Sequence, residues 1–417
     1  MKLIIFGKFS FKHIYFLFYA ISTFLTTLFS ELLFEYSEIY TLYFYQMYLL
    51  TLANFISIIP FLINRKLTKR INQEKIEQKD NIADKKINVI YNIKNNITSK
   101  EIIKVTLRVT IFYFLAYFIM FLFNFINDDP KVIYSYSLQT DLIFNTVTQY
   151  LVSHFVLNYN FYSHHYLSFG INILCTLILL IIDIINIVNK GISSYKFYIH
   201  IFIKMIRLFL LALGDNYAKI TLYKYFLSPF SLMLFMAIQE TVILIIITIL
   251  FIFIKSKATN EIIFKEFSGF FSGINLLYNI VLLIFVFFYD AFLLILIDRF
   301  SPSHLPLEFI LYSFLYNIYF IIKNKIKNGE IEYYLYVNIF IYIILFIAAM
   351  VHNEIFIINR CGLNANTKLF LDYKLEQERK ENEILSNKID MDYYYLETKN
   401  AIEDEKLIPL DDLISND

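Results

Sequence analysis

Three ionisable side chains interrupt one long apolar segment in the middle of the chain. Lys204, Arg207 and Asp215 lie within residues 198–222, and a helix turns by about 100° per residue. On such a helix Lys204 and Asp215 lie within about 20° of each other and Arg207 lies about 60° away, so one face carries all three. Two fixed cations there would suit an anionic ligand such as a phosphate or a carboxylate. The alternative is that Lys204 reaches a nearby membrane interface and Asp215 lies at the other end of the helix.

Two other segments carry polar side chains along one helical face. Asn145 and Gln149 are four residues apart, so they could line a cavity together or bond to a neighbouring helix. Tyr312, Tyr316 and Asn317 also share a face. A tyrosine ring can stack on a ligand and its hydroxyl can donate to a phosphate, or the ring can pack in the core. We include all five, together with Lys204 and Arg207, in the predicted set of ligand-binding residues.

Carboxyl and amide groups also fall inside apolar segments of the second half. Gln239 and Glu240 lie in the middle of one segment, and Asp290 lies in the last third of the next. Ionisable residues are expensive in hydrocarbon and tend to mark substrate or ion pathways, so these three join the predicted set. A carboxyl group withdrawn from water could carry a coupling proton, and Glu240 is the best candidate for that role.

The histidines do not follow a known catalytic spacing. His154, His164 and His165 form the only sequence cluster, but they do not match the histidine boxes of di-iron membrane enzymes. We expect His164 and His165 in a loop. We also find no nucleophile elbow, no P-loop and no metal-ligand pair. The sequence therefore predicts no catalytic residue, no metal and no cofactor.

The composition is that of a membrane protein. Of 417 residues, 58% are hydrophobic, 19% aromatic and only 18% charged, and the mean hydropathy is +0.56. Ordinary soluble domains are far less apolar. The net charge is +1, and no basic block alternates with aromatic residues, so nucleic acid is excluded as a partner. The two cysteines, Cys175 and Cys361, lie far apart and suggest no disulfide framework.

Ten segments are long and apolar enough to cross a bilayer, which takes about 20 residues. They are residues 13–30, 40–63, 105–126, 138–157, 165–188, 198–222, 229–254, 274–297, 304–323 and 333–358. The predicted fold is therefore an all-α polytopic membrane protein with ten transmembrane helices.

Basic residues orient these helices, because Lys and Arg accumulate in cytoplasmic loops. With a cytosolic N-terminus, the inside segments hold 21 Lys and Arg residues and the outside loops hold 9. Both termini are thus predicted in the cytosol. The chain is predicted to begin with a cytosolic N-terminus at residues 1–12. A first repeat follows at 13–188, with a cytosolic loop at 64–104, and a second repeat at 198–358. An acidic cytosolic tail forms residues 359–417.

The last apolar segment ends in the polar stretch VHNEIFIINRCGLNANTK, residues 351–368. Arg360 lies where a cytosolic positive charge would end the helix. Gly362 and Asn364 suit a helix cap and turn. Glu354 is expected to reach the headgroups rather than act in chemistry.

The ten segments divide evenly about the connection at 189–197. Five precede it and five follow it, and an odd-numbered repeat must insert upside down. Each half joins its third and fourth helices through a link that contains proline, at 127–139 and at 298–308. Many transporters use inverted repeats of this kind to build two alternating gates around one central site.

Four stretches resemble the drug/metabolite transporter superfamily, closest to the nucleotide-sugar-transporter-like or EamA-like solute carriers of protists. They are FYSHHYLSFGINI (161–173), YKYFLSPFSLMLF (223–235), SPSHLPLEF (301–309) and NEIFIINRCGLNANTK (353–368). The resemblance covers roughly residues 105–375. It implies two inverted five-helix repeats, in which helices one to four and six to nine surround the substrate cavity and helices five and ten are peripheral.

We therefore expect a secondary transporter that moves a small organic, anionic solute, a nucleotide sugar or another metabolite, by alternating access and without bond chemistry. The alternative is a polytopic membrane enzyme that acts on lipid or lipid-linked sugar. A channel or receptor-like protein is a third class, which the inverted halves and the lack of a filter-like sequence disfavour.

Sorting motifs bear on the compartment. EDEKLI at 403–408 resembles an acidic dileucine signal, and Tyr393 to Leu396 fits a tyrosine-based one. An endomembrane, such as Golgi, ER or an endolysosomal or vacuolar membrane, is favoured over the plasma membrane. The expected partners are the solute and membrane lipid, and a homodimer is left open.

Overall fold

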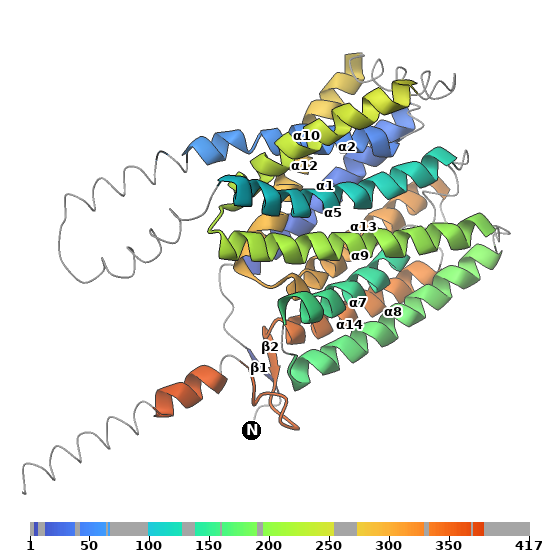
Figure 1. The fold of residues 1–417 in the computed structure, drawn as a ribbon. Helices are drawn as coiled ribbons and strands as arrows, with labels where there is room; N and C mark the ends of the chain where they lie inside the picture. Colours follow the sequence, from blue (N-terminus) through green and yellow to red (C-terminus); the bar gives the residue numbers. More distant parts are fainter. Residues whose placement is uncertain are drawn as a thin grey trace, which may run out of the picture. The chain divides into compact units, whose positions relative to one another are not determined.

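The structure is a computed structural model, and nearly all of the residues that it describes are helical (Figure 1). The described residues are 4–6, 13–37, 42–63, 66, 99–126, 138–158, 161–189, 195–253, 273–328, 333–367 and 370–378. Most of the expected cytosolic loop, the link at 127–137 and both sorting motifs lie outside them. The predicted all-α class is confirmed, apart from one pair of three-residue strands.

Each of the ten predicted segments overlaps one long helix. The helices are α1 (Ile14–Ser37), α2 (Leu42–Phe55), α5 (Ser99–Ile126), α7 (Leu138–Leu157), α8 (Ser163–Asn189), α9 (Tyr195–Lys224), α10 (Pro229–Phe253), α12 (Gly273–Arg299), α13 (Pro306–Asn328) and α14 (Tyr333–His352), and a short 3-10 turn, η2 (Pro302–His304), precedes α13.

Length and composition qualify seven of the described helices as membrane spans. The spans are Ile14–Glu31, Lys100–Leu122, Ser163–Ile182, Pro229–Leu250, Leu276–Arg299, Pro302–Ile326 and Tyr334–His352. This confirms an integral polytopic membrane protein. The helices α2, α7 and α9 do not meet both criteria. α2 is short because the chain turns at residues 56 and 57 before a further helical stretch at 58–63, and α9 carries several charged side chains.

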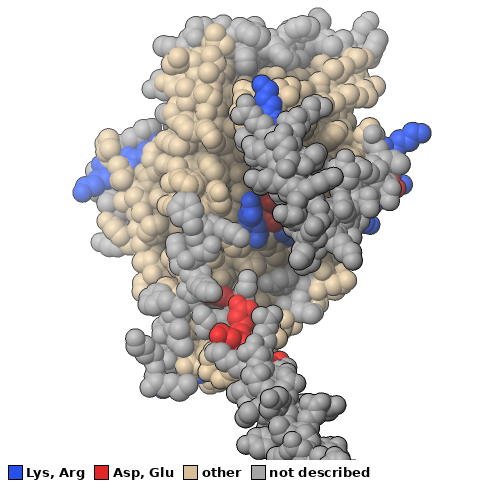
Figure 2. Space-filling view, turned by 90° about the vertical axis from the view of Figure 1, so that its left-hand side faces the viewer, with Lys and Arg blue, Asp and Glu red and all other residues tan. Residues whose placement is uncertain are grey.

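The outer faces of the helices are apolar. On α10, for example, Val242, Ile245, Ile246 and Ile249 are each about half exposed, at 54, 51, 52 and 46%. Figure 2 shows that charged side chains occupy only a few positions on the described part of one face. Such a large apolar surface is unfavourable in water but not in lipid, because transfer of apolar area out of water is worth roughly 25 cal/mol per Å².

The chain divides into two compact units, residues 9–356 and residues 1–8 with 357–417. The second unit contains β1 (Ile4–Phe6) and all but the first residue of β2 (Phe356–Ile358), and the two strands form a two-stranded sheet. A series of turns follows β2, and residues 370–378 form a helix. The strand pair was not predicted, because a three-residue strand leaves no alternation that sequence periodicity could reveal.

The last long helix ends earlier than predicted, at His352 rather than at residue 358. Glu354 adopts a positive φ of 56°. The backbone NH of Glu354 donates to the Val351 carbonyl at 3.1 Å, and that of Ile355 donates to the Met350 carbonyl at 2.9 Å. This is the Schellman pattern that ends helices, with glutamate in the position that glycine usually takes. Gly362 also has a positive φ of 72°, but it lies in the later turns and does not cap α14.

The helix contacts of the large unit are similar in its two halves. In chain order, α1, α2, α5, α7 and α8 of the first half correspond to α9, α10, α12, α13 and α14 of the second. The two most extensive contacts, α5 with α9 and α12 with α1, are related by this correspondence. The pair α7 and α9 matches α1 and α13, and the pair α7 and α8 matches α13 and α14. The contacts of α2 with α10, and of α8 with α14, map onto themselves.

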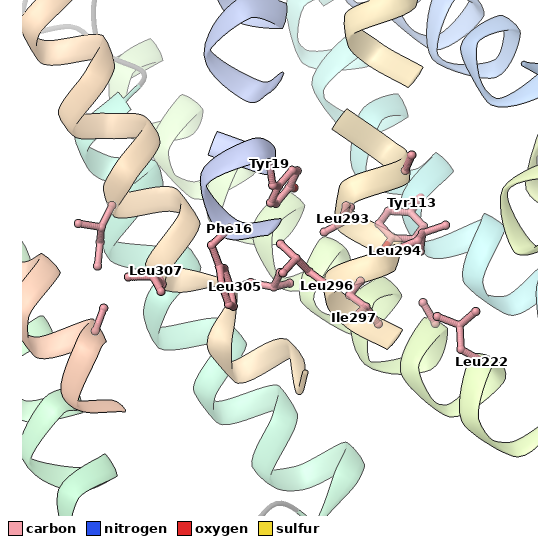
Figure 3. Packing of buried hydrophobic residues seen from close by; sticks show 14 of the residues in the cluster. Phe16, Tyr19, Tyr113, Leu222, Leu293, Leu294, Leu296, Ile297, Leu305 and Leu307 are labelled. Atoms are coloured by element: carbon pink, nitrogen blue, oxygen red, sulfur yellow. The ribbon is translucent and has the colours of Figure 1, made fainter. Parts of the chain in front are cut away.

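The largest buried apolar cluster lies where α1, α12 and the start of α13 meet (Figure 3). Phe16 and Tyr19 of α1 pack there with Leu296 and Ile297 of α12 and with Leu305, which precedes α13. The cluster extends to Tyr113 of α5 and Leu222 of α9. It therefore draws on helices from both halves of the chain.

The contact between α5 and α9 depends on a small residue at Gly214. A Cβ atom added there would lie 3.3 Å from the ring of Tyr113, which is tighter than ordinary packing. We expect Gly214→Ala to lower the thermal unfolding midpoint in detergent slightly, and Gly214→Val to lower it by several degrees, because overpacking a core costs about 1–3 kcal/mol.

Gly170 of α8 provides the matched control, because a Cβ atom added there meets nothing within 4 Å. The midpoint of Gly170→Ala should equal or exceed that of the wild type. An equal loss of stability in Gly170→Ala and Gly214→Val would contradict the assignment of a close contact at Gly214.

Candidate functional site

A cavity with a partly polar wall lies inside the large unit. Its walls come from α1, α2, α5, α7, α9, α10, α12 and the start of α13, and no described residue of α8 or α14 contributes. The lining residues are Tyr19, Leu50, Asn54, Tyr113, Tyr117, Asn145, Gln149, Leu211, Asp215, Met233, Met236, Tyr289, Asp290, Leu293, Leu294, Leu305 and Phe309. The cavity thus combines apolar side chains with a small number of polar groups, as small-molecule sites do.

One carboxyl group of the wall joins three helices. Asp215 of α9 accepts a hydrogen bond at Oδ1 from the Tyr113 hydroxyl of α5 at 2.5 Å. Its Oδ2 accepts a second bond from the Gln149 amide of α7. Asp215 is only 5% exposed, so it faces the cavity rather than the membrane interface. Asn145, one turn before Gln149, also lines the cavity.

A second group of acidic side chains lies across α2, α10 and α12. Asp290 of α12 lines the cavity, and Asn54 of α2 interacts with the carboxyl groups of both Asp290 and Glu240. Thr51 Oγ1 also donates to Oε2 of Glu240 at 3.3 Å. Glu240 itself is buried behind the wall and is not a lining residue. The two carboxyl groups therefore share one amide partner, and a change of charge on one changes the electrostatic energy of the other.

Tyrosines form much of the remaining polar wall. The rings of Tyr19 and Tyr289 lie 5.2 Å apart between centroids, and Tyr289 also interacts with Tyr117 through its side chain. The guanidinium of Arg207 lies over the Tyr117 ring at 5.6 Å, a cation–π distance. Arg207 thus stands behind a lining residue, and neither it nor the buried Lys204 lines the cavity.

Gln239 joins two helices outside the cavity. Its Oε1 accepts from Thr110 Oγ1 at 2.7 Å, and its Nε2 donates to Thr106 Oγ1 at 2.8 Å and to the Ile103 carbonyl at 3.2 Å. Gln239 therefore connects α10 to α5. Asn317 has a similar role, because its Nδ2 donates to the Leu335 carbonyl at 3.1 Å and so connects α13 to α14.

The two predicted site tyrosines of α13 belong to a ladder between α13 and α1. Thr27 Oγ1 and the Tyr312 hydroxyl are 3.0 Å apart, and the Tyr316 hydroxyl donates to Glu31. The first rung is Thr23, whose Oγ1 donates to Oε1 of Glu308 at 2.8 Å. The two residues of each pair are 285 positions apart in the sequence. Both helices therefore advance in the same direction by one turn from one pair to the next, so α1 and α13 run parallel.

Of the ten predicted site residues, the cavity brings together Asn145, Gln149 and Asp290. Glu240 and Arg207 each contact a lining residue, while Lys204, Gln239, Tyr312, Tyr316 and Asn317 lie elsewhere. Sequence reasoning missed the lining tyrosines because the chain contains 34 tyrosines and nothing distinguishes four of them. Asn54 gave a weak signal, as one of few amides inside an apolar segment.

The comparisons with known proteins assign no family. No protein-family model matches the chain, and no curated protein matches it.

The hydrogen bonds of Gln239 yield a stability prediction that separates it from the cavity. We expect Gln239→Leu to lower the free energy of unfolding by about 1–2 kcal/mol, because Thr106 and Thr110 lose their shared partner and interhelical bonds in membranes are worth about 0.6 kcal/mol each. The neighbouring substitution Ile238→Leu, on the exposed face of α10, serves as the control. Thermal unfolding in detergent measures both, and a wild-type midpoint in Gln239→Leu would contradict the interhelical role.

Proposed function

We propose that the protein is a secondary transporter that moves a small organic solute across a membrane by alternating access. The observation that carries this proposal is the cavity with a partly polar wall, enclosed by otherwise apolar helices from both halves of the chain. Polar and ionisable groups inside a membrane are expensive and tend to mark a pathway. A cavity that draws on both halves can open to either side when one half rocks against the other.

The repeated helix contacts support two inverted five-helix repeats. The contacts made by each helix of the first half recur for its counterpart in the second. The parallel run of α1 and α13 is also what the first and ninth of ten alternating spans require. We therefore propose ten spans, including α2, α7 and α9. α2 is shortened by the turn at residues 56 and 57, and α9 carries several charged side chains. All three helices contribute side chains to the cavity.

The lining also supports the resemblance to drug/metabolite transporters as a proposal. That resemblance implies a cavity between helices one to four and six to nine, and the lining residues come from those eight helices. The proposal keeps both termini in the cytosol and the protein in an endomembrane. The sorting motifs at 393–408, on which the endomembrane location is based, lie outside the described residues.

The charge of the wall revises the expected solute. The expectation of an anion depended on Lys204 and Arg207, and neither lines the cavity. The described lining instead contains two carboxyl side chains, Asp215 and Asp290, and no Lys or Arg. We propose that the solute carries an amine or another hydrogen-bond donor, which these carboxyl groups can bind.

Counterflow into liposomes tests the proposed function. Purified protein is reconstituted, and labelled organic cations, neutral polar solutes and organic anions are offered in turn. We expect saturable accumulation of an unaltered cationic or neutral solute. Asp290→Asn should reduce its uptake at least 10-fold, because the loss of a charge-assisted bond costs about 1.5–3 kcal/mol.

Asp372→Asn is the control, because Asp372 is exposed in the helix at 370–378, outside the large unit. Its uptake should equal that of the wild type. Conversion of the labelled compound into a product would instead indicate a membrane enzyme. A lack of counterflow for all three solute classes in the wild type would refute the transporter proposal.

Cysteine cross-linking tests the parallel helices on which the inverted repeat depends. In a variant with both native cysteines replaced, Thr27→Cys with Tyr312→Cys should be cross-linked by a short bifunctional thiol reagent that spans the length of the lost tyrosine ring, because these side chains meet across α1 and α13. Thr23→Cys with Tyr316→Cys should not, because these positions lie two rungs apart. Cross-linking of the second pair in preference to the first would show that the helices do not have this register.

A further inference from the structure

Histidines from three distant parts of the sequence meet in the large unit. His164 and His165 lie in the first turn of α8, rather than in a loop as predicted, and His304 and His352 lie at the ends of η2 and α14. Ring centroids are 4.0 Å apart for His164 and His165, 4.6 Å for His165 and His352, and 5.5 Å for His352 and His304. Glu354 follows α14 directly. The cluster does not line the central cavity.

Three imidazoles of this cluster, those of His164, His165 and His352, are buried, and two of them lack well-formed hydrogen bonds. His164 is 2% exposed and His352 is 1% exposed. Neither ring nitrogen of His164 has a hydrogen-bond partner of good geometry, and His352 makes only a loose contact with the backbone of Ser303. A buried polar atom without a partner is unfavourable. These nitrogens are therefore free to act as ligands.

The separation of His164 and Glu354 suits a shared metal ion better than a hydrogen bond. His164 Nε2 lies 3.4 Å from Oε1 of Glu354, whereas N–H···O bonds span about 2.7–3.2 Å. Two ligands that are each 2.0–2.1 Å from a tetrahedral zinc ion lie about 3.4 Å from one another. One donor atom from each of His164, His165 and Glu354 lies within 4.8 Å of the other two. To bind one ion, the two donor atoms that are farthest apart have to approach each other by on the order of 1 Å. The Glu354 side chain can move to allow this, because it is 25% exposed.

The backbone holds Glu354 in this position at an energetic disadvantage. Glu354 occupies the left-handed residue of the Schellman motif that ends α14, where glycine has no steric penalty. Non-glycine residues in such conformations are found disproportionately at functional sites. The motif turns the chain so that the carboxylate faces His164.

We propose that His164, His165 and Glu354 form a binding site for a divalent transition metal of the zinc class. Two imidazoles and one carboxylate are ligands that zinc accepts, whereas calcium and magnesium prefer oxygen ligands alone. His352 is the nearest further imidazole, and it or a water molecule completes the coordination. The ion would join the start of α8 to the end of α14, two helices that pack side by side (Figure 1). It would therefore stabilise α8 and α14, of which no described residue lines the cavity.

A purely packing role is the competing explanation. Aromatic rings surround the cluster. The ring centroids of Tyr150 and His352 are 4.5 Å apart, and those of Phe161 and His165 are 5.9 Å apart. Packing accounts for the burial of the imidazoles. It does not account for the lack of a well-formed hydrogen bond at either nitrogen of His164, or for a carboxylate held beside them by a left-handed residue.

Metal titration of the full-length protein in detergent tests this site. The protein is stripped with a chelator and titrated with Zn²⁺, and with Co²⁺, whose visible absorption reports coordination by protein ligands. We expect one equivalent of either ion per chain and a higher unfolding midpoint with Zn²⁺. Glu354→Gln should weaken Zn²⁺ binding at least 10-fold. His154→Ala should bind like the wild type, because His154 is exposed on α7 and outside the donor group.

A second substitution separates ligation from structure. Glu354→Gly removes the ligand but places glycine in a left-handed position. Without metal it should therefore unfold at the wild-type midpoint or above, and Zn²⁺ should no longer raise that midpoint. If the wild type binds no more Zn²⁺ or Co²⁺ than Glu354→Gly does, the proposal is wrong and the cluster is an aromatic packing cluster only. Neither result depends on whether the protein transports a solute.

Discussion

The bilayer interior offers no water to a buried carboxyl or amide group, so each such group has to find its partner on another helix. Asp215 binds side chains of α5 and α7, Glu240 binds a side chain of α2, and Glu308 binds a side chain of α1. These bonds determine which helices are neighbours. They also explain why polar side chains occur inside otherwise apolar helices.

The same requirement leaves a space in the middle of the unit. Apolar side chains can fill a core to high density, but the polar groups of the cavity wall are already held in fixed positions by bonds to their partners. Tyr113 and Gln149 are held by Asp215, and Asn54 is held between Glu240 and Asp290. The wall is therefore organised before a ligand arrives. Preorganisation of this kind lowers the entropy that binding has to offset.

The position of the helices could be predicted from the sequence, because a bilayer span requires about 20 mostly apolar residues. The prediction for α10 ended one residue away from the observed end. The ends of α2 and α14 were predicted too late. In both helices apolar residues continue past the point where the backbone turns, at residues 56–57 and at Glu354, and hydropathy does not register a turn.

The cavity wall could be predicted only in part. Asn145, Gln149 and Asp290 were found because a polar residue in an apolar helix is conspicuous. The same signal selected Gln239 and Asn317, whose partners Thr110 and Leu335 lie on other helices. A helix with neighbours on several sides has several inward faces, and its own sequence does not say which of them meets the cavity. The histidine cluster was missed for a related reason, because residues 165 and 352 become neighbours only in the folded chain.

The ladder between α1 and α13 has a repeat of one helical turn. A hydroxyl meets a carboxyl group at its two outer rungs, and two hydroxyls meet at the middle rung. A slide of α1 along α13 by one turn, about 5.4 Å, would bring Thr27 opposite Glu308 and Glu31 opposite Tyr312. A hydroxyl would again meet a carboxyl group at each of these rungs. A second register would thus form hydroxyl–carboxyl pairs at two of the three rungs, while Thr23 and Tyr316 would leave their present partners. A seam that connects the two halves in this way can act as a stepwise track, along which one half moves relative to the other without breaking the bundle.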